Sequence, residues 1–458
     1  MTLRKILLAG TALGAAALMA GPAFAGSAAA TQAEIDALKQ QMQELQQKLD
    51  DMQIQTSDAL NDVRNIVTMP NGHPTFKSLD GNFEASIGGR LQMDAYGVDA
   101  DNTSTSQIGR SRWGAEIRRA RLNMAGRLWD WKYKAEIDFA NNGVSAKDVF
   151  LQHDFFIYGA AITIGNQYEP FGLDNLTSDN YNTFMEFSLP VKLRTDRNLG
   201  VVLSYSDAQH LGMAAGLFSD NKVSQPAAKD TTDWSTAGRV WYAPINDGTT
   251  VLHLGLDGRY QSYEGGSTGG GASGGITAIP EANGAGNTLS TGAIANISDD
   301  YRYGPEVAFE YGPFEAQAEY TWMTIERNNL RNIDLKGGYG EVSYFLTGDS
   351  RNYDVKGGVF ARPNVSAGAI QIAARYSTMD TSDSFGAGGI TGVTMRDGTT
   401  VVSGLTGKEN DITLGANYYW NPNVRLMLNY VNADINYTRT ATKDEKDNII
   451  ETRLQLDW

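Results

Sequence analysis

Arginine recurs at every second position in one segment of this chain. Arg119, Arg121 and Arg127 lie on one face of an extended strand, because successive side chains of a strand point to opposite sides. Leu122 and Met124 lie on the other face, which is apolar. A row of guanidinium groups offers forked hydrogen bonds to oxyanions such as phosphate. The spacing predicts either a track for anions or a row of charges that pair with carboxylates across an interior.

Other apolar segments also carry charged residues at alternate positions. If the apolar alternates contact lipid, the basic residues that face the interior are Arg90, Arg119, Arg121, Arg127, Lys132, Lys134, Arg239, Arg259, Arg375, Arg425 and Arg453. The acidic residues expected there are Asp94, Glu136, Asp138, Asp257, Glu306, Glu310, Glu315, Glu319 and Glu341. Basic residues concentrate in the first predicted strands and acidic ones in the tenth to twelfth. The pattern predicts a pore with one positive and one negative wall, which suits general diffusion as well as anion selection.

Residues typical of enzymes and metal sites do not form a recognisable motif. The histidines stand one to a segment, without the spacing of a zinc site, at His73, His153, His210 and His253. Cys is absent, which excludes disulfides and thiolate chemistry. The Gly-rich stretch 265–275 lacks the strand-to-helix context and the Lys of a phosphate-binding loop, so it reads as an external loop. The sequence predicts no catalytic residue, no metal and no cofactor.

The elements that must position the charged residues are strands of period two. Sixteen segments fit this pattern, near 83–96, 112–128, 131–140, 147–156, 160–167, 198–206, 210–218, 234–242, 251–263, 301–311, 314–325, 336–348, 368–378, 410–420, 423–436 and 447–458. Short and long connections alternate between them, as in outer-membrane barrels. The exception is 349–367, which is long where a short turn is expected. A seventeenth strand at 353–361 would break the even number, so we predict an all-β fold, a sixteen-stranded antiparallel transmembrane β-barrel.

The end of the chain favours a membrane barrel over a soluble sheet protein, and the composition excludes two other classes. The chain ends with Thr452, Leu454, Leu456 and Trp458 at alternate positions, an apolar face that finishes on an aromatic residue. The mean hydropathy is -0.35 and no apolar run reaches the ~18 residues of a membrane-spanning helix, which excludes a helical membrane protein. The formal net charge of -15 shows no overall basic footprint for nucleic acid.

The first 25 residues have the organisation of a secretory signal peptide. Arg4 and Lys5 precede an apolar stretch over 6–20, and Ala23 and Ala25 form a small-x-small cleavage site. Export to the cell envelope and a final place in the outer membrane are therefore expected.

Residues 26–66 are expected to form a short periplasmic helix with a heptad pattern. The apolar positions are spaced alternately by three and four, at Ile35, Leu38, Met42, Leu45, Leu49 and Met52. The stripe predicts a coiled coil or, alternatively, a helix held by another partner. Pro70 and Pro74 then indicate a linker over 67–80, and the barrel domain is predicted to span 81–458.

Several segments resemble the phosphate-selective porin family, porins O and P of Gram-negative outer membranes. They are GRLQ from Gly89, RRARLNMAG from Arg118, EPFGLDNLTSDNYNTFMEFS from Glu169, YGPFEAQAEY from Tyr311, SYFLTGDSRNY from Ser343, GAIQIAARYS from Gly368 and NPNVRLMLNYV from Asn421. The resemblance implies a trimeric, water-filled channel whose third long loop folds inward. The constriction-loop residues that it implies are Glu169, Pro170, Phe171, Gly172, Thr183, Phe184, Met185, Glu186, Arg194 and Arg197; an exposed extracellular loop is the alternative.

Two positions depart from the family pattern. Phe187 follows Glu186 where the family commonly has Arg, and Asp179 stands where a small polar residue is common. Both changes make the constriction less positive, so the resemblance supports a porin more firmly than it supports phosphate.

The function expected is passive diffusion of small anions, with phosphate or another oxyanion first. The alternatives are a general diffusion porin with weak ion selectivity and a barrel that anchors an envelope-tethering stalk. Expected partners are small anions, outer-membrane lipid, two further copies in a homotrimer and, through the coiled coil, a periplasmic protein or peptidoglycan. Nucleic acid is not an expected partner.

Overall fold

The computed structural model describes residues 28–100, 112–140, 142–155, 159–219, 233–263, 275–385, 393–394, 400–401, 405–438 and 444–458. The predicted signal peptide and nearly all of the Gly-rich stretch 265–275 lie outside these residues. The chain divides into two units, Met1–Asn65 and Ile66–Trp458, and each is described by itself.

The first unit contains one long helix, α1 (Ala28–Ile66), which confirms the predicted helical segment. Its heptad residues from Ile35 to Met52 are 46% to 68% exposed, so their stripe has no cover within the described part of this unit. No helix among the described residues is long and apolar enough to cross a membrane. Association of α1 in a coiled coil stays a prediction.

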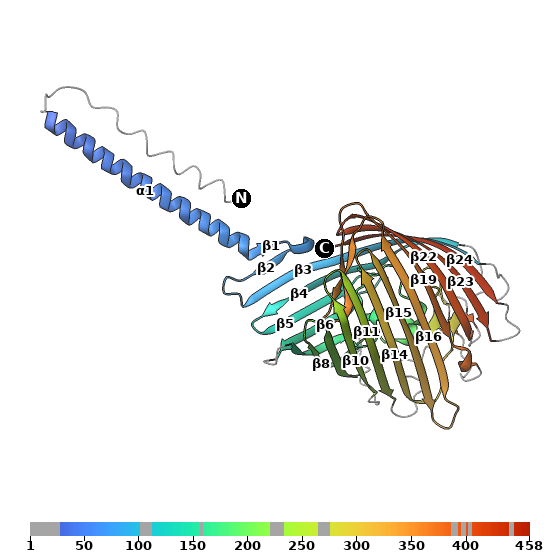
Figure 1. The fold of residues 1–458 in the computed structure, drawn as a ribbon. Coiled ribbons are helices and arrows are strands. Elements are labelled where there is room, and N and C mark those ends of the chain that lie inside the picture. The colour runs from blue at the N-terminus through green and yellow to red at the C-terminus, as the bar shows by residue number, and fades with distance from the viewer. Residues whose placement is uncertain are drawn as a thin grey trace. The chain divides into compact units, whose positions relative to one another are not determined.

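The second unit is a closed antiparallel barrel of sixteen strands, as predicted (Figure 1). The strands are β3 (Phe83–Ala100), β4 (Arg112–Leu128), β5 (Trp131–Asp138), β6 (Ser145–Asp154), β7 (Ala160–Tyr168), β8 (Arg197–Ser206), β9 (Leu211–Ser219), β10 (Trp234–Asn246), β11 (Thr250–Ser262), β14 (Ile297–Tyr311), β15 (Phe314–Arg327), β16 (Ile333–Phe345), β19 (Ala369–Asp380), β22 (Gly407–Asn421), β23 (Val424–Tyr437) and β24 (Glu445–Asp457). Each predicted segment corresponds to one of them.

Short elements occupy the connections. The predicted linker contains β1 (Val67–Thr68), η1 (Pro70–Gly72) and β2 (Thr75–Lys77), and β2 pairs with β3. The long connections carry α2 (Leu173–Leu176), η2 (Leu189–Leu193), β12 (Thr277–Ala278), β13 (Leu289–Ser290), η3 (Ser382–Ser384), β20 (Val393–Thr394) and β21 (Thr400–Val401).

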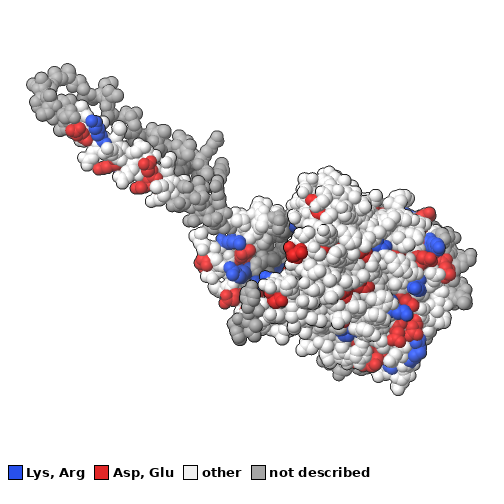
Figure 2. Space-filling model, in the orientation of Figure 1, with Lys and Arg blue, Asp and Glu red and all other residues white. Residues whose placement is uncertain are grey.

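Alternation along each strand sorts the side chains between two environments. Leu122 and Met124 of β4 are 48% and 47% exposed on the outer face, while Arg119 and Arg121 are buried inside. Figure 2 shows the result on one face of the barrel, where charged residues lie mostly toward the strand ends. An apolar outer wall with a polar interior is what a lipid-spanning barrel requires.

The connection 346–368, which broke the predicted alternation, is an inward hairpin rather than a seventeenth barrel strand. Its strands β17 (Ser350–Asp354) and β18 (Val359–Asn364) pair with each other and, among the strands that the structure describes, with no other. The Trp241 ring N–H donates to the Val355 carbonyl at 2.8 Å, and the Tyr353 hydroxyl lies 2.6 Å from Nδ1 of His253. Because Trp241 and His253 face the interior, this inner hairpin lies inside the barrel.

The last residue of the chain helps to close the barrel. The Trp458 carbonyl accepts a hydrogen bond from Gly89 N at 2.9 Å, and Trp458 N donates to the Gly89 carbonyl at 3.1 Å. A Cβ at Gly89 would lie 2.5 Å from the Trp458 ring. Glycine on the first barrel strand therefore makes room for the terminal aromatic residue.

Candidate functional site

The connection between β7 and β8, residues 169–196, crosses the interior, and we call it the inner loop. Its far side is held by strands nearly half-way around the barrel. Nδ2 of Asn417 donates to the Thr183 carbonyl at 2.8 Å, and Nη1 of Arg425 donates to the Asn182 carbonyl at 2.8 Å. Arg453 Nη1 donates to the carbonyl of Met185. The loop therefore folds inward, as the family resemblance implies.

Asp257, Glu306 and Glu319 of β11, β14 and β15 form what we call the carboxylate wall, and two of them, Asp257 and Glu319, bind the near side of the inner loop. Gly172 N donates to Asp257 at 3.0 Å, and Leu173 N donates to Glu319 at 3.0 Å. Arg194 contributes an ion pair with Glu319 at 2.9 Å. Gly172 has φ +80, and a Cβ there would meet Arg194 at 2.8 Å, so the sharp turn at this anchor requires glycine.

Five arginines from β3, β4 and β24 form the opposite surface, the arginine wall: Arg90, Arg118, Arg119, Arg121 and Arg453. Asp179 of the inner loop reaches three of them. It pairs with Arg90, with Nε of Arg119 at 2.5 Å and with Nη1 of Arg121 at 3.5 Å. Asp179, one of the two residues that depart from the family pattern, is thus a counter-ion of three arginines of this wall.

Glu186 is the second loop carboxylate on the arginine wall. Both of its oxygens accept hydrogen bonds from Arg118 at 2.8 Å, and Oε1 lies 2.7 Å from Nη2 of Arg453. Burial alone would raise the pKa of Glu186, but Arg118, Arg119 and Arg453 hold the pKa well below its ordinary value. The carboxylate is therefore ionised and fixes the loop in place.

Three carboxylates of the strands complete the pairing. Glu136 lies 3.0 Å from Arg90 and 3.2 Å from Arg121, and Asp138 lies 2.8 Å from Arg121. Asp94 accepts two hydrogen bonds at 2.7 Å from Arg453. Each of the five arginines thus has at least one of these five carboxylates as an ion-pair partner.

Simple alternation places Arg118 on the lipid side, and it is absent from the predicted interior set. A register shift between Gln92 and Met93 inserts one extra residue into β4, so Arg118 turns inward to Glu186. A β-bulge of this kind depends on the partner strand and leaves no signal in the period-two pattern.

Other predicted basic residues are also paired. Arg239 binds Glu306 at 2.7 Å and the carbonyls of the inner hairpin, and Arg259 binds Glu169 at 2.5 Å. Arg375 binds Glu281 at 2.6 Å.

The barrel end that carries β2 holds three further predicted basic residues, Arg127, Lys132 and Lys134. Arg127 donates to the Gly81 carbonyl at 2.8 Å, Lys132 is exposed beside Asp154, and Lys134 lies 2.6 Å from Asp148.

The acidic residues predicted to face the interior are buried there, except Asp257, which is half-buried. The remaining constriction-loop residues are packing or anchoring groups. Pro170 and Phe171 are buried, the guanidinium of Arg375 lies 4.3 Å from the Phe184 ring, and Thr183 accepts a hydrogen bond from Arg351 at 3.0 Å. Arg197 pairs with Asp148 at 2.5 Å.

A cavity of about 400 Å³ lies between the arginine wall, the inner loop and residues 279–283. Its charged lining comprises seven basic residues, Arg118, Arg119, Arg121, Lys147, Lys192, Arg194 and Arg197, and five acidic residues, Asp138, Asp179, Glu186, Asp196 and Glu281. Seven minus five leaves a formal charge of +2. Neither Lys147 nor Lys192 has an ion-pair partner among the described residues, and the predicted set contained neither.

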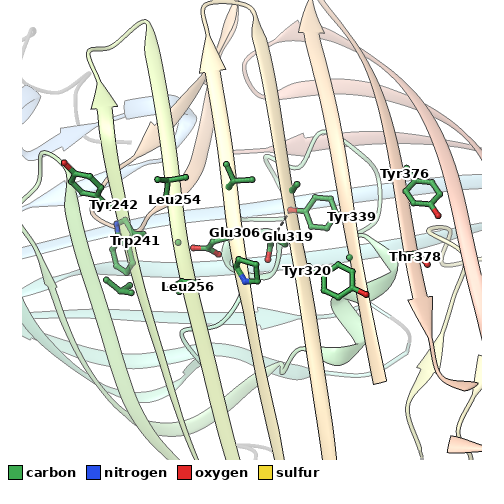
Figure 3. A pocket seen from close by; sticks show the side chains of 16 residues that line it. Trp241, Tyr242, Leu254, Leu256, Glu306, Glu319, Tyr320, Tyr339, Tyr376 and Thr378 are labelled. Carbon is green, nitrogen blue, oxygen red and sulfur yellow. Dashed lines mark hydrogen bonds between the residues drawn. The ribbon is translucent and has the colours of Figure 1, made fainter. Parts of the chain in front are cut away.

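A larger hollow of about 780 Å³ lies on the outer wall and is separate from this path (Figure 3). Exposed apolar side chains such as Tyr242, Leu254 and Leu256 border it, and small residues such as Ala318 and Gly338 form its floor. Because its exposed border is mostly apolar, we assign this hollow to the lipid-facing surface, although Glu306 and Glu319 of the carboxylate wall also line it.

Comparison with known families identifies the barrel. Residues 86–458 match the family described as phosphate-selective porin O and P. The chain belongs to this porin family. The barrel is therefore that of an outer-membrane porin, and the family and fold are those of channels rather than enzymes.

The chain is also similar to two curated relatives and to one solved structure. An uncharacterized protein of Caulobacter vibrioides is 30% identical over 410 residues, which cover 84% of this chain and 76% of the relative. Porin O of Pseudomonas aeruginosa is 27% identical over 428 residues, covering 86% and 93%. The anion-selective porin from Comamonas acidovorans superposes with a TM-score of 0.52 at 12% identity, covering 82% of this chain and 99% of that chain, and this likeness concerns the fold alone.

Proposed function

We propose that this porin conducts small anions by passive diffusion, and that its cation-lined cavity between the inner loop and the arginine wall sets the preference. The observation that carries the proposal is the +2 lining of that cavity in a chain whose net charge is -15. A fixed charge in a narrow, partly desolvated passage attracts counter-ions and repels co-ions.

Lys147 and Lys192 are the residues to which we assign this selectivity. The arginines of the cavity are held by carboxylates, whereas these two ammonium groups have no ion-pair partner among the residues that the structure describes. An ammonium group without a fixed counter-ion can exchange its hydration for contact with a passing anion.

Reversal potentials in a salt gradient test the assignment. One unit charge about 8 Å from an ion contributes about 1 kcal/mol at an effective dielectric constant of ~40, or roughly fivefold in a permeability ratio. Lys147→Gln together with Lys192→Gln should therefore shift the chloride-to-potassium ratio strongly toward potassium. Lys132→Gln, at an exposed pair with Asp154, is the matched control and should change the ratio little. An unchanged ratio in the double variant would contradict the proposal.

The second part of the proposal concerns the preference for phosphate over other anions. We expect oxyanions to enter with a weaker preference than the family description suggests, because Phe187 lines the cavity where the family commonly has Arg. Phe187→Arg should strengthen the block of chloride current by phosphate, since a guanidinium adds charge-assisted hydrogen bonds. Absence of phosphate block in both proteins would favour the alternative of a general diffusion porin with weak ion selectivity.

We further propose that three copies assemble through the barrel and that α1 joins them in a coiled coil, within reach of a periplasmic partner or peptidoglycan. The heptad stripe of α1, exposed in a single chain, supports the second part. β5, with eight residues, is shorter than the about 9 to 11 that span lipid, which favours protein contact at that part of the wall. Removal of 31–66 should leave a conducting barrel, and cross-linking of intact and truncated protein would report whether α1 contributes to assembly.

A further inference from the structure

Asp257, Glu306 and Glu319 come together on the carboxylate wall from three neighbouring strands, β11, β14 and β15. One carboxylate oxygen from each lies within 4.8 Å of the others, and the described residues contain no second group of three or more such ligands. Glu306 and Glu319 occupy directly opposed positions of the β14–β15 ladder. Figure 3 shows their side chains next to each other. Like charges in opposed positions destabilise a sheet unless something neutralises them.

Two oxygens of the group lack any hydrogen-bond partner although they are buried. Oε2 of Glu306 and Oδ1 of Asp257 accept no hydrogen bond from the residues that the structure describes, and the Glu306 side chain has no exposed surface. The other oxygen of Glu306 accepts from Arg239 at 2.7 Å, and the other oxygen of Asp257 accepts from Gly172 N at 3.0 Å. Buried carboxylate oxygens without partners carry a large desolvation penalty, so these two oxygens are the free ligands of the group.

The charges around the group leave a deficit of two positive charges. The acidic members are Asp174, Asp257, Glu306 and Glu319, and Arg194 and Arg239 are the cations that pair with them. Nε2 of His253 lies 3.1 Å from Glu306. Four carboxylates against two guanidinium groups leave -2 when this imidazole is neutral. One divalent cation balances that charge.

We propose that Asp257, Glu306 and Glu319 bind a divalent cation, and that the cation joins the base of the inner loop to the carboxylate wall. Ca²⁺ is the ion of choice, because its oxygen ligands lie at about 2.3 to 2.6 Å and two of them can be separated by up to about 5 Å across the ion. Mg²⁺ requires shorter distances, about 2.0 to 2.1 Å. Glu319 already accepts Leu173 N, Asp174 N and the Tyr339 hydroxyl, so it contributes charge and the link to the loop.

Calcium binding can be measured on the full-length barrel refolded without lipopolysaccharide, whose phosphates themselves bind divalent ions. After treatment with a chelator, Ca²⁺ titrated calorimetrically at constant pH should bind with one site per chain and an affinity in the range of about 0.1 to 1 mM. The same titration should raise the temperature at which the folded band disappears on a denaturing gel. Absence of binding at about 5 mM Ca²⁺ would overturn the proposal.

Variants separate this site from nonspecific binding and from protonation. Asp257→Asn with Glu306→Gln should lower the Ca²⁺ affinity at least about tenfold, because two charged ligands are lost. Glu310→Gln, four residues along the same face of β14, is the matched control and should bind as the parent does. Glu306→Asp retains the charge, keeps the test open if the double variant misfolds, and should weaken binding by shortening one ligand. Equal affinity in all variants, or stabilisation by acid alone with none by Ca²⁺, would contradict the proposal.

Discussion

The two walls that hold the inner loop use opposite charges in different ways. On the arginine wall, Asp179 and Glu186 of the loop complete a set of five cations and five anions, so that surface is closed by ion pairs. On the carboxylate wall, backbone N–H groups and Arg194 bind Glu319, and oxygens of Asp257 and Glu306 remain without partners. Every arginine of the arginine wall has a carboxylate partner among the described residues. The carboxylate wall has more negative than positive charges.

This difference indicates that abundant arginine is not the same as a positive pore. A buried guanidinium that is fully paired fixes structure, whereas an unpaired charge beside the path acts on passing ions. The arginine wall therefore serves the shape of the constriction. In our proposal, the ion selectivity comes from the small excess of positive charge in the cavity, which we assign to Lys147 and Lys192.

The largest effect is expected when the arginine wall loses its loop partners. Asp179→Asn with Glu186→Gln removes two negative charges beside the cavity, about 2 kcal/mol, so the anion-to-cation permeability ratio should rise by about thirtyfold before screening. Reversal potentials in bilayers measure it. Asp154→Asn, at an exposed pair, should leave the ratio unchanged. A ratio that stays constant in the double variant would mean that the freed arginines re-pair within the wall.

A second effect should appear on the carboxylate wall. Arg194→Gln leaves Glu319 and Asp174 buried without their cation, a loss of about 3 kcal/mol or more for a broken buried pair. The near end of the inner loop should then detach. Limited proteolysis should cut within 169–196 several-fold faster than in the parent, whereas Arg331→Gln, at an exposed pair with Asp383, should not change the rate. Equal cleavage rates would show that the backbone hydrogen bonds alone hold the loop.

A smaller effect is expected from the inner hairpin. Replacing residues 350–364 by a short turn removes the carbonyls that bind Arg239 and Trp241 and widens the passage on the carboxylate side. Single-channel conductance should rise by roughly twofold, with little change in ion preference. A parallel variant, Lys356→Gln, retains the hairpin and should conduct as the parent does. An unchanged conductance after the replacement would place the narrowest point elsewhere.

The smallest effect concerns pH. The pKa of Glu186 lies well below its ordinary value, so the folded state gains stability above the ordinary Glu pKa and loses it only as pH falls through the lowered one. Ion preference should therefore change little between about pH 7 and pH 5. A marked shift toward anions over this interval, measured by reversal potential, would show that Glu186 takes up a proton more readily than this surrounding of arginines allows.

Period-two alternation predicted the sixteen strands because lipid on one side and water on the other impose it on every strand. It also placed Arg90, Arg119 and Arg121 inside. It could not place Arg118, whose direction is set by a bulge against β3, nor the inner hairpin, whose position depends on contacts with Arg239, Trp241 and His253 from distant strands.

Lys147 and Lys192 were missed for two further reasons. Alternation with the outward Val149 and Leu151 would place Lys147 on the lipid side, but a register shift of β6 against β5 lets it line the cavity next to the inward Asp148. Lys192 lies in η2, a short helix of the inner loop, and its direction follows from the path of that loop across the barrel. The ion pairs could not be predicted from the sequence, because Asp179 contacts its arginines only when the inner loop has folded into the barrel.

The Trp458 ring that occupies the space above Gly89 has a consequence for the order of events in biogenesis. Trp458 lies at the junction of β24 and β3, so this junction can form only after the C-terminal strand of the barrel has become available for pairing. Until then, β3 and β24 both present unpaired edges that are prone to aggregate. Pairing of β24 with β3 is therefore the step that removes both edges at once.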